Sequence, residues 1–417
     1  MPSRRRVLQS ALAAPVILAA PRARAAEPVK IGVIFPLTGN SASAGEQAKD
    51  AVEFGAYLVN HAFPQFKAIP PLGTAGLSNL GGAKIELDIA DHRGNPTLAA
   101  TDTLRLITQD HVVAMLGTYQ SSTGFTATAV AERYGIPFVL GDTTAPNITG
   151  RGFQWTFRVG PIAPNFAATY MRFLAAMQKK GHAIRNISVV NENTDYGTSV
   201  SDAIVEAAKK SNVPLAGRIA YSASSTDLST EALKIKQFNP TVAIFVSYTS
   251  DAILYMKAFK FLNWLPPMII GDDSGFSDPS FIPTVGRDAQ GVLSRSSFTA
   301  GKPGTAVYEL NKMFEEKYGQ SLADDSARNL EALLVLADAI NRAGSTAPAK
   351  IQAALRATDL KADQVVASYR GVRFDKTGQN ILGSADLVQL HGDQYLTVWP
   401  TDHAVAKLEW PMPGWRT

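Results

Sequence analysis

The stretch VVAMLGTYQSSTG, residues 112–124, joins an apolar run to a cluster of hydroxyl side chains. Residues 112–116 have the composition of a buried strand, and a helical pattern follows from residue 122. Ser and Thr are ordinary helix N-caps, so capping alone is one explanation of this junction. The other explanation is that the unpaired N–H groups of a helix start hold an anionic ligand group.

Strand-like and helix-like segments alternate on both sides of this junction. The first series has strands predicted at 30–37, 84–91, 112–117 and 136–140, and helices at 44–60, 96–110 and 122–134. The second series has strands predicted at 186–193, 214–221, 241–248 and 267–273, and helices at 197–211, 228–238 and 250–262. Such an order predicts α/β architecture with two doubly wound parallel sheets, each covered by helices on both faces.

The remaining segments are less regular. Residues 143–165 are rich in turn residues and separate the two α/β units. After the second unit we expect helices at 305–319, 327–344 and 347–357, followed by strands joined by Gly-rich turns. The Pro- and Gly-rich stretch 61–84 is too long for an ordinary connection, which indicates an insertion or a functional loop.

Residues 1–25 have the order of an export signal. Three arginines at 4–6 precede an apolar run at 11–20, and Ala-Arg-Ala at 23–25 suits a cleavage site near Ala25. The apolar run is too short to span a bilayer. The sequence SRRRVLQ resembles the twin-arginine export motif, and an ordinary Sec signal is the alternative. We therefore expect an exported protein, located in the periplasm or, as a second choice, secreted.

Charge and cysteine content narrow the function classes. Without the five arginines of the export signal the chain has 35 basic and 36 acidic residues, so no electrostatic argument favours nucleic acid or membrane binding. The chain has no cysteine, which excludes disulfides and a lipid-anchoring thiol. Stability must then come from a large core, which a chain of this length is able to build.

Signatures of catalysis are missing from the sequence. The six histidines form no pair at metal-ligand spacing, and no Gly-x-Ser-x-Gly, GxGxxG or phosphate-binding loop is present. We therefore predict no catalytic residue, no metal and no cofactor. An exported hydrolase or lyase that uses Asp142, Asp272 or Asp273 is kept as a minor alternative.

Small polar residues recur where the predicted strands end. The loops are PLTGNSASAG (36–45), GTYQSSTG (117–124), GDTTAP (141–146), NTDYG (193–197), SYTSD (247–251) and GDDSG (271–275). In open parallel sheets, ligands bind outside the carboxyl ends of the strands. If the two units face each other, all six loops line one cleft.

Several of these motifs, in their order and spacing, resemble one known family. They include KIGVIFPLTG, DHRGNP (91–96), LGTYQSSTG, YGIPFV (134–139), TTAP, W-x-FR (155–158), DYG (195–197) and FDKTGQN (374–380). From Lys30 to about Pro400 the chain resembles type I periplasmic solute-binding proteins of the branched-chain-amino-acid (Leu/Ile/Val) class, the substrate receptors of ABC importers.

The resemblance implies a domain organisation. Two lobes close around the ligand by hinge bending, and the chain crosses between them near 145–162, 290–296 and 365–375. The N-terminal lobe is then 26–158 plus 295–370, and the C-terminal lobe is 159–294 plus 371–417.

The resemblance also implies the ligand-binding residues of the N-terminal lobe. Ser121 and Ser122 lie where the family binds the ligand α-carboxylate, with Thr144 and its neighbour Thr143 opposite them. The physical argument agrees, because hydroxyls and free N–H groups at a helix start hold a carboxylate without a fixed cation. Capping by one of the two serines is the alternative.

In the C-terminal lobe, Asp273 matches the acidic partner of the ligand ammonium, although Asp272 is an alternative. Tyr196 matches a tyrosine that covers the ligand, and Tyr248 follows a strand that also reaches the cleft. Either tyrosine is alternatively a packing residue of the surface between the lobes.

Two departures from the family put leucine, isoleucine and valine in doubt as ligands. Ala44 replaces a ligand-contacting tyrosine, which we expect to enlarge the pocket. Asp142 stands where small residues are common, and its carboxylate is predicted either to engage a donor on the ligand or to face solvent.

The predicted function is therefore capture of an amino acid or related small carboxylate and its delivery to the permease subunits of an ABC transporter. We expect a monomer that catalyses no reaction. A ligand-sensing receptor domain of the same fold is the main alternative.

Overall fold

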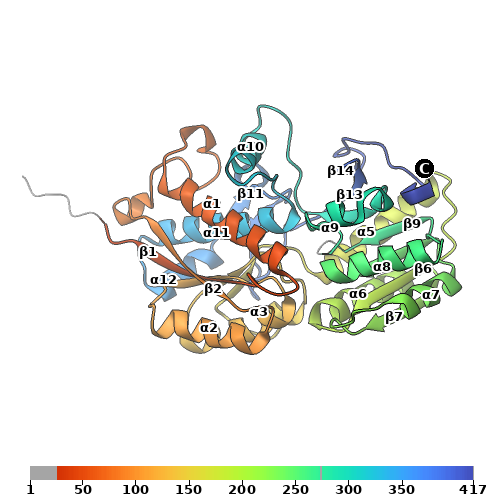
Figure 1. Ribbon diagram of the computed structural model, residues 1–417. Coiled ribbons are helices and arrows are strands. Elements are labelled where there is room, and N and C mark those ends of the chain that lie inside the picture. The colour runs from red at the N-terminus through yellow and green to blue at the C-terminus, as the bar shows by residue number, and fades with distance from the viewer. Residues whose placement is uncertain (1–25, 273–274, 417) are drawn as a thin grey trace, which may run out of the picture.

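The computed structural model describes residues 26–272 and 275–416, so the predicted export signal and Asp273 lie outside the described residues. Figure 1 shows two α/β bodies side by side, each built around its own sheet. We refer to them as the first lobe and the second lobe. No helix within the described ranges is long and apolar enough to span a membrane.

The first lobe contains a fully parallel five-stranded sheet in the order β2-β1-β3-β4-β5. Its strands are β1 (Val29–Phe35), β2 (Ile85–Asp91), β3 (Ala114–Gly117), β4 (Phe138–Leu140) and β5 (Thr156–Arg158). Its covering helices are α1 (Ala42–Asn60), α2 (Pro96–Thr108), α3 (Ser121–Tyr134) and α11 (Asp324–Ala343).

Alternation of apolar side chains along the strands explains why helices cover both faces of this sheet. Val33 and Phe35 of β1 pack in one core with α1 and α11, whereas Ile34 packs in a second core with α2 and α3. Both faces are therefore buried, as a parallel sheet requires. The predicted parallel, doubly wound arrangement is confirmed.

The second lobe contains a seven-stranded sheet in the order β14-β13-β10-β9-β8-β6-β7. Its strands are β6 (Ile187–Glu192), β7 (Leu215–Tyr221), β8 (Val242–Val246), β9 (Met268–Gly271), β10 (Leu293–Ser296), β13 (Asp386–His391) and β14 (Gln394–Trp399). Its helices are α5 (Ala163–Lys179), α6 (Asp195–Lys210), α7 (Ser229–Phe238), α8 (Thr249–Phe261) and α9 (Phe281–Val285). Strands β13 and β14 are antiparallel additions to an otherwise parallel sheet.

The chain passes between the lobes three times. After β5 it enters α5 of the second lobe, and after β10 it returns to the first lobe. There α10 (Ala306–Tyr318), α11 and α12 (Pro348–Arg356) share the core of α1. The short pair β11 (Asp359–Lys361) and β12 (Gly371–Arg373) follows, and β13 rejoins the second sheet.

The sequence did not predict the elements in and just after the turn-rich stretch 143–165. The short helix α4 (Asn147–Gly150) is a single turn, and the edge strand β5 has three residues. Both are too short to show a periodic pattern of apolar side chains. Helix α5 follows directly. The insertion 61–84 forms two short 3₁₀ turns, and its residues Phe66, Leu72 and Leu77 are buried in the first core.

Candidate functional site

A small polar cavity lies between the lobes, near the carboxyl ends of strands in both sheets. Its lining residues are Tyr119, Ser121, Asp142, Thr144, Asp325 and Arg328 of the first lobe, and Tyr196, Tyr248 and Arg295 of the second. Four of the six polar loops singled out in the sequence contribute to it. The cavity volume is about 10 Å³, which is room for about one water molecule.

The junction between β3 and α3, which contains Ser121, forms one wall of this cavity. Helix α3 begins at Ser121, and its N-cap is Gln120, which makes no side-chain capping hydrogen bond. The Oγ of Ser121 instead accepts hydrogen bonds from the N–H groups of Thr144 and Ala145, at 3.2 and 3.3 Å. Capping by a serine is therefore not observed, and Ser121 ties the loop after β4 to the start of α3.

The structure separates the predicted hydroxyl residues. Thr144 lines the cavity, and its Oγ1 is buried with no hydrogen-bond partner among the described residues. Ser122 is half-buried and Thr143 is buried, and neither of them lines the cavity. Whether Ser122 and Thr143 contact a ligand stays a prediction.

Asp142 is buried, with 4% of its surface exposed, and it lines the cavity. Its carboxylate accepts a hydrogen bond from the amide of Asn329 and lies 3.4 Å from Nη2 of Arg328. Its backbone carbonyl also accepts from Arg328, at 3.2 Å. The alternative that Asp142 faces solvent is wrong, because α11 covers this loop.

Three tyrosines form an aromatic wall that crosses the cleft. Tyr119 of the first lobe lies 5.9 Å from Tyr248 of the second, and Tyr248 lies 5.3 Å from Tyr196, measured between ring centroids. Burial, together with the Glu192 carboxylate, raises the pKa of Tyr248 well above its ordinary value, so this hydroxyl stays protonated. The sequence predicted Tyr196 and Tyr248 but not Tyr119.

Asp272, the alternative to Asp273, is held inside the second lobe. It is fully buried and does not line the cavity. Its carboxylate accepts hydrogen bonds from the hydroxyls of Tyr170 and Tyr196, and lies 3.3 Å from Nε of Arg295. Ala44 is also buried and does not line the cavity.

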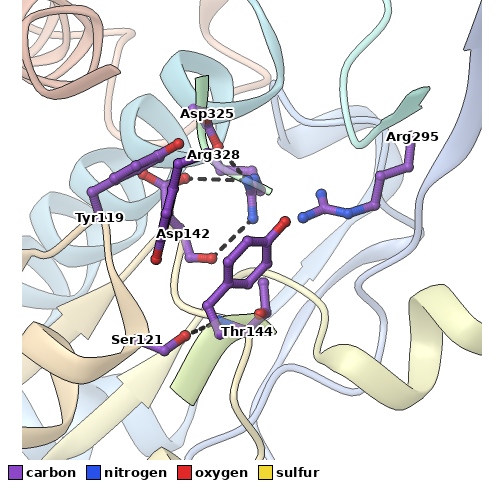
Figure 2. Close-up of a pocket in the computed structure, with 9 residues that line it drawn as sticks. Tyr119, Ser121, Asp142, Thr144, Arg295, Asp325 and Arg328 are labelled. Carbon is purple, nitrogen blue, oxygen red and sulfur yellow. Dashed lines mark hydrogen bonds and ion pairs between the residues drawn. The ribbon is translucent and has the colours of Figure 1, made fainter. Parts of the chain in front are cut away.

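Sequence reasoning missed two buried arginines that reach the cavity. Arg295 comes from β10 and Arg328 from the second turn of α11, and each side chain is 1% exposed. The Asp324 carboxylate lies 2.9 Å from Nη1 of Arg295 and 2.9 Å from Nη2 of Arg328. Figure 2 shows Arg328 beside Asp142 and Asp325, with the guanidinium of Arg295 directed toward them. Arg295 lies between Ser294 and Ser296, and Arg328 lies among polar residues near the start of α11, so the local sequence gave no signal that either arginine is buried.

A third arginine organises the loop that carries Thr144. Arg158 of β5 is fully buried, and its Nη1 donates to the carbonyls of Thr143 and Ala145, both at 2.9 Å. Its Nε donates to the side chain of Gln379 at 2.8 Å. Burial lowers the pKa of Arg158 to about 9, so it is still charged at neutral pH.

The lobes also meet outside the cavity. Ser43, in the first turn of α1, donates a hydrogen bond of 2.9 Å to Asp278 of the second lobe. Within residues 26–272 and 275–416, no group of three or more acidic or histidine side chains is arranged to hold a metal ion.

Comparison with known proteins identifies the family. Residues 28–393 match the periplasmic binding protein family. Leu/Ile/Val-binding protein homolog 8 of Brucella abortus (strain 2308) is 28% identical over 389 residues, which are 91% of this chain and 92% of that protein.

Two solved structures share the fold. The leucine-binding protein LivK of Thermotoga maritima MSB8 superposes with a TM-score of 0.75 at 23% identity, covering 88% of this chain and 97% of that one. A solute-binding protein of an ABC transporter from Rhodopseudomonas palustris BisB5, in complex with 3,4-dihydroxybenzoic acid, superposes with a TM-score of 0.72 at 17% identity, covering 88% and 95%. The chain therefore belongs to the periplasmic binding protein family and has the type I fold of its Leu/Ile/Val-binding members.

Proposed function

We propose that this protein is the substrate-binding component of an ABC importer, which captures an amino acid or a related small carboxylate between its lobes. The observation that carries the proposal is the buried polar cavity lined by side chains of both lobes. Ligands of open α/β sheets bind at this end of the strands. The ligands named for the two structural relatives, leucine and 3,4-dihydroxybenzoic acid, both carry a carboxylate.

In this proposal Ser121 and Thr144 hold the ligand carboxylate, and Tyr196 and Tyr248 cover the ligand from the second lobe. Asp273 is kept as the proposed partner of a ligand ammonium. The cavity has room for about one water molecule, so the ligand enters when the lobes part. The ligand then favours closure because it contacts both lobes only in the closed state.

The proposal includes a location and partners. Residues 1–25 direct export and are removed near Ala25, and the mature monomer in the periplasm delivers its ligand to a membrane permease. A ligand-sensing receptor domain of the same fold is the second candidate function, and an exported hydrolase or lyase is the third.

Thr144→Val is a sharp test of the site, because it removes a buried hydroxyl that has no partner among the described residues. Thr143→Val is the matched control, since this neighbouring hydroxyl is also buried and unpartnered there but does not line the cavity. A panel of amino acids and small carboxylates is first screened by thermal shift, and hits are measured by calorimetry. We expect Thr144→Val to weaken binding about 5- to 20-fold, with an unchanged melting temperature, and Thr143→Val to have less than about a 2-fold effect.

Other outcomes would contradict the proposal. Equal effects of the two variants would place the ligand away from this cavity. Conversion of the bound ligand to a product would favour the enzyme alternative, and tight binding without any permease-dependent uptake in cells would favour the sensor.

A further inference from the structure

The lining of the cavity is polar on every side that the described residues form. Each of the nine lining residues carries a hydroxyl, carboxylate or guanidinium group, and none of them has an aliphatic side chain. Pockets for small ligands are usually lined mostly by apolar and aromatic side chains. An aliphatic ligand group in this cavity would therefore displace water from polar groups without offering them a hydrogen bond, which is unfavourable.

A hydroxyl of the second lobe is left for the ligand. Tyr248 is half-buried as a whole, but its hydroxyl oxygen is buried and has no hydrogen-bond partner among the described residues. The hydroxyl of the neighbouring Thr194 donates to Glu192 at 2.8 Å. Because a buried hydroxyl without a partner is costly, a ligand group that bonds Tyr248 would stabilise the closed state.

Packing fixes the position of the Tyr248 ring. Its centroid lies 5.9 Å from that of Tyr119 in the first lobe and 5.3 Å from that of Tyr196 in the second. Its backbone N–H donates to the Asp251 carboxylate at 3.3 Å, at the start of α8. A side chain that is already held in place loses little conformational freedom on binding, so its hydrogen bond contributes to the choice of ligand.

The opposite wall, in the first lobe, suits the ligand carboxylate. The Oγ of Ser121 accepts two hydrogen bonds, from the N–H groups of Thr144 and Ala145, so its own hydrogen remains to be donated. The buried Oγ1 of Thr144 adds a second hydroxyl without a partner among the described residues. With the carboxylate on this wall, Tyr248 meets a different part of the ligand.

We infer that the ligand carries, in addition to its carboxylate, a neutral hydrogen-bonding group such as a hydroxyl or a carboxamide, which the Tyr248 hydroxyl binds. A neutral group suits this partner, because one donates while the other accepts and no further charge is buried. The inference rests on the proposed function, since it assumes that the cavity is the ligand site. Leucine, isoleucine and valine are then poor ligands.

Matched ligand pairs test the inference with the mature chain, freed of co-purified ligand by unfolding and refolding. L-Threonine is compared with L-valine, L-asparagine with L-leucine, and 4-hydroxybenzoate with 4-methylbenzoate, because each pair differs in one polar group at similar size. Calorimetry at pH 7 is expected to show at least about 10-fold tighter binding of the polar member of at least one pair. L-Lysine and L-glutamate serve as the charged comparison and are expected to bind more weakly than that member.

A variant that removes one oxygen atom shows whether Tyr248 causes the preference. Tyr248→Phe is expected to reduce the ratio within the pair to below about 3-fold. The matched control is Tyr255→Phe, in the same helix α8, since this hydroxyl is also buried without a partner among the described residues but does not line the cavity. The control should leave the ratio unchanged, and melting temperatures confirm that both variants are folded.

The outcomes separate this inference from the proposed function. Equal or tighter binding of the apolar members would show that water satisfies the Tyr248 hydroxyl, and would overturn the inference while the proposed function stands. Tightest binding of a charged amino acid, or a ratio that Tyr248→Phe leaves unchanged, would do the same. No binding of any of these ligands or of the wider panel would overturn both.

Discussion

We predict that replacing Glu331 with glutamine removes part of the pH dependence of the free energy of unfolding. Glu331 lies in α11, is 1% exposed, and accepts hydrogen bonds from the N–H groups of Val366 at 2.6 Å and Ala367 at 3.4 Å. Burial raises the pKa of this carboxyl to about 7, although the two N–H donors act in the opposite direction. The side chain ties α11 to the segment that precedes β12.

The sign of the effect follows from the raised pKa. The folded protein holds the proton up to about pH 7, whereas the unfolded chain releases it near the ordinary value of 4.5. The stabilisation from this group is therefore fully present below pH 4.5 and is lost as the pH rises through 7. For these two pKa values the loss between pH 5 and pH 8 is about 2.5 kcal/mol.

Glu331→Gln has no proton to lose, so this part of the pH dependence should disappear. Denaturant unfolding at pH 5, 6, 7 and 8 measures the free energy of unfolding of both proteins. Other buried acids, such as Asp251, whose pKa burial raises to about 6, contribute equally to both and cancel in the difference. The variant should gain about 2.5 kcal/mol relative to wild type between pH 5 and pH 8.

The control is Glu316→Gln, on the exposed side of α10, which should follow the wild-type curve at every pH. If the free energies of unfolding of Glu331→Gln and wild type differ by the same amount at all four pH values, within about 0.5 kcal/mol, the carboxyl of Glu331 is not a buried group with a raised pKa. The reasoning then fails.

Two further predictions concern the buried charges. Asp324→Asn weakens two charged contacts of 2.9 Å and should lower the free energy of unfolding by about 2–4 kcal/mol. Glu206→Gln, at an exposed ion pair, is the control and should leave the free energy of unfolding unchanged in the same denaturant experiment. A loss below about 1 kcal/mol for Asp324→Asn would show that this carboxylate does not hold the arginines. Arg158→Gln removes the donors to the carbonyls of Thr143 and Ala145. Amide hydrogen exchange in this loop, measured by mass spectrometry, should therefore become faster. Unchanged exchange would contradict the role of Arg158 in positioning the loop.

The series of strands and helices was readable from the sequence because each segment carries its own periodic pattern. The parallel order of the first sheet followed from that alternation, and the strand predicted at 30–37 and the helix at 96–110 correspond to β1 and α2. The edge strand β5 was missed because three residues are too few to show a period.

Part of the candidate site could also be predicted from the sequence. The end of each parallel strand marks one sheet edge, so Ser121, Thr144 and Tyr196 were placed near a common cleft by their loops, and they line one cavity. The sequence did not distinguish Thr144 from Thr143, because neighbouring residues in a loop have no fixed orientation until other segments pack on them.

The sequence by itself determined the α/β class, the repeating strand–helix order and the polar character of the loops, since these depend on neighbours along the chain. Only the tertiary structure brought Arg295 and Arg328 to Asp142 and Asp324. These residues come from segments up to about two hundred positions apart, on two lobes that the chain visits in turn. Local patterns carry no information on such partners, because an ion pair depends on distance in space and on burial, and both exist only once the lobes have folded and met.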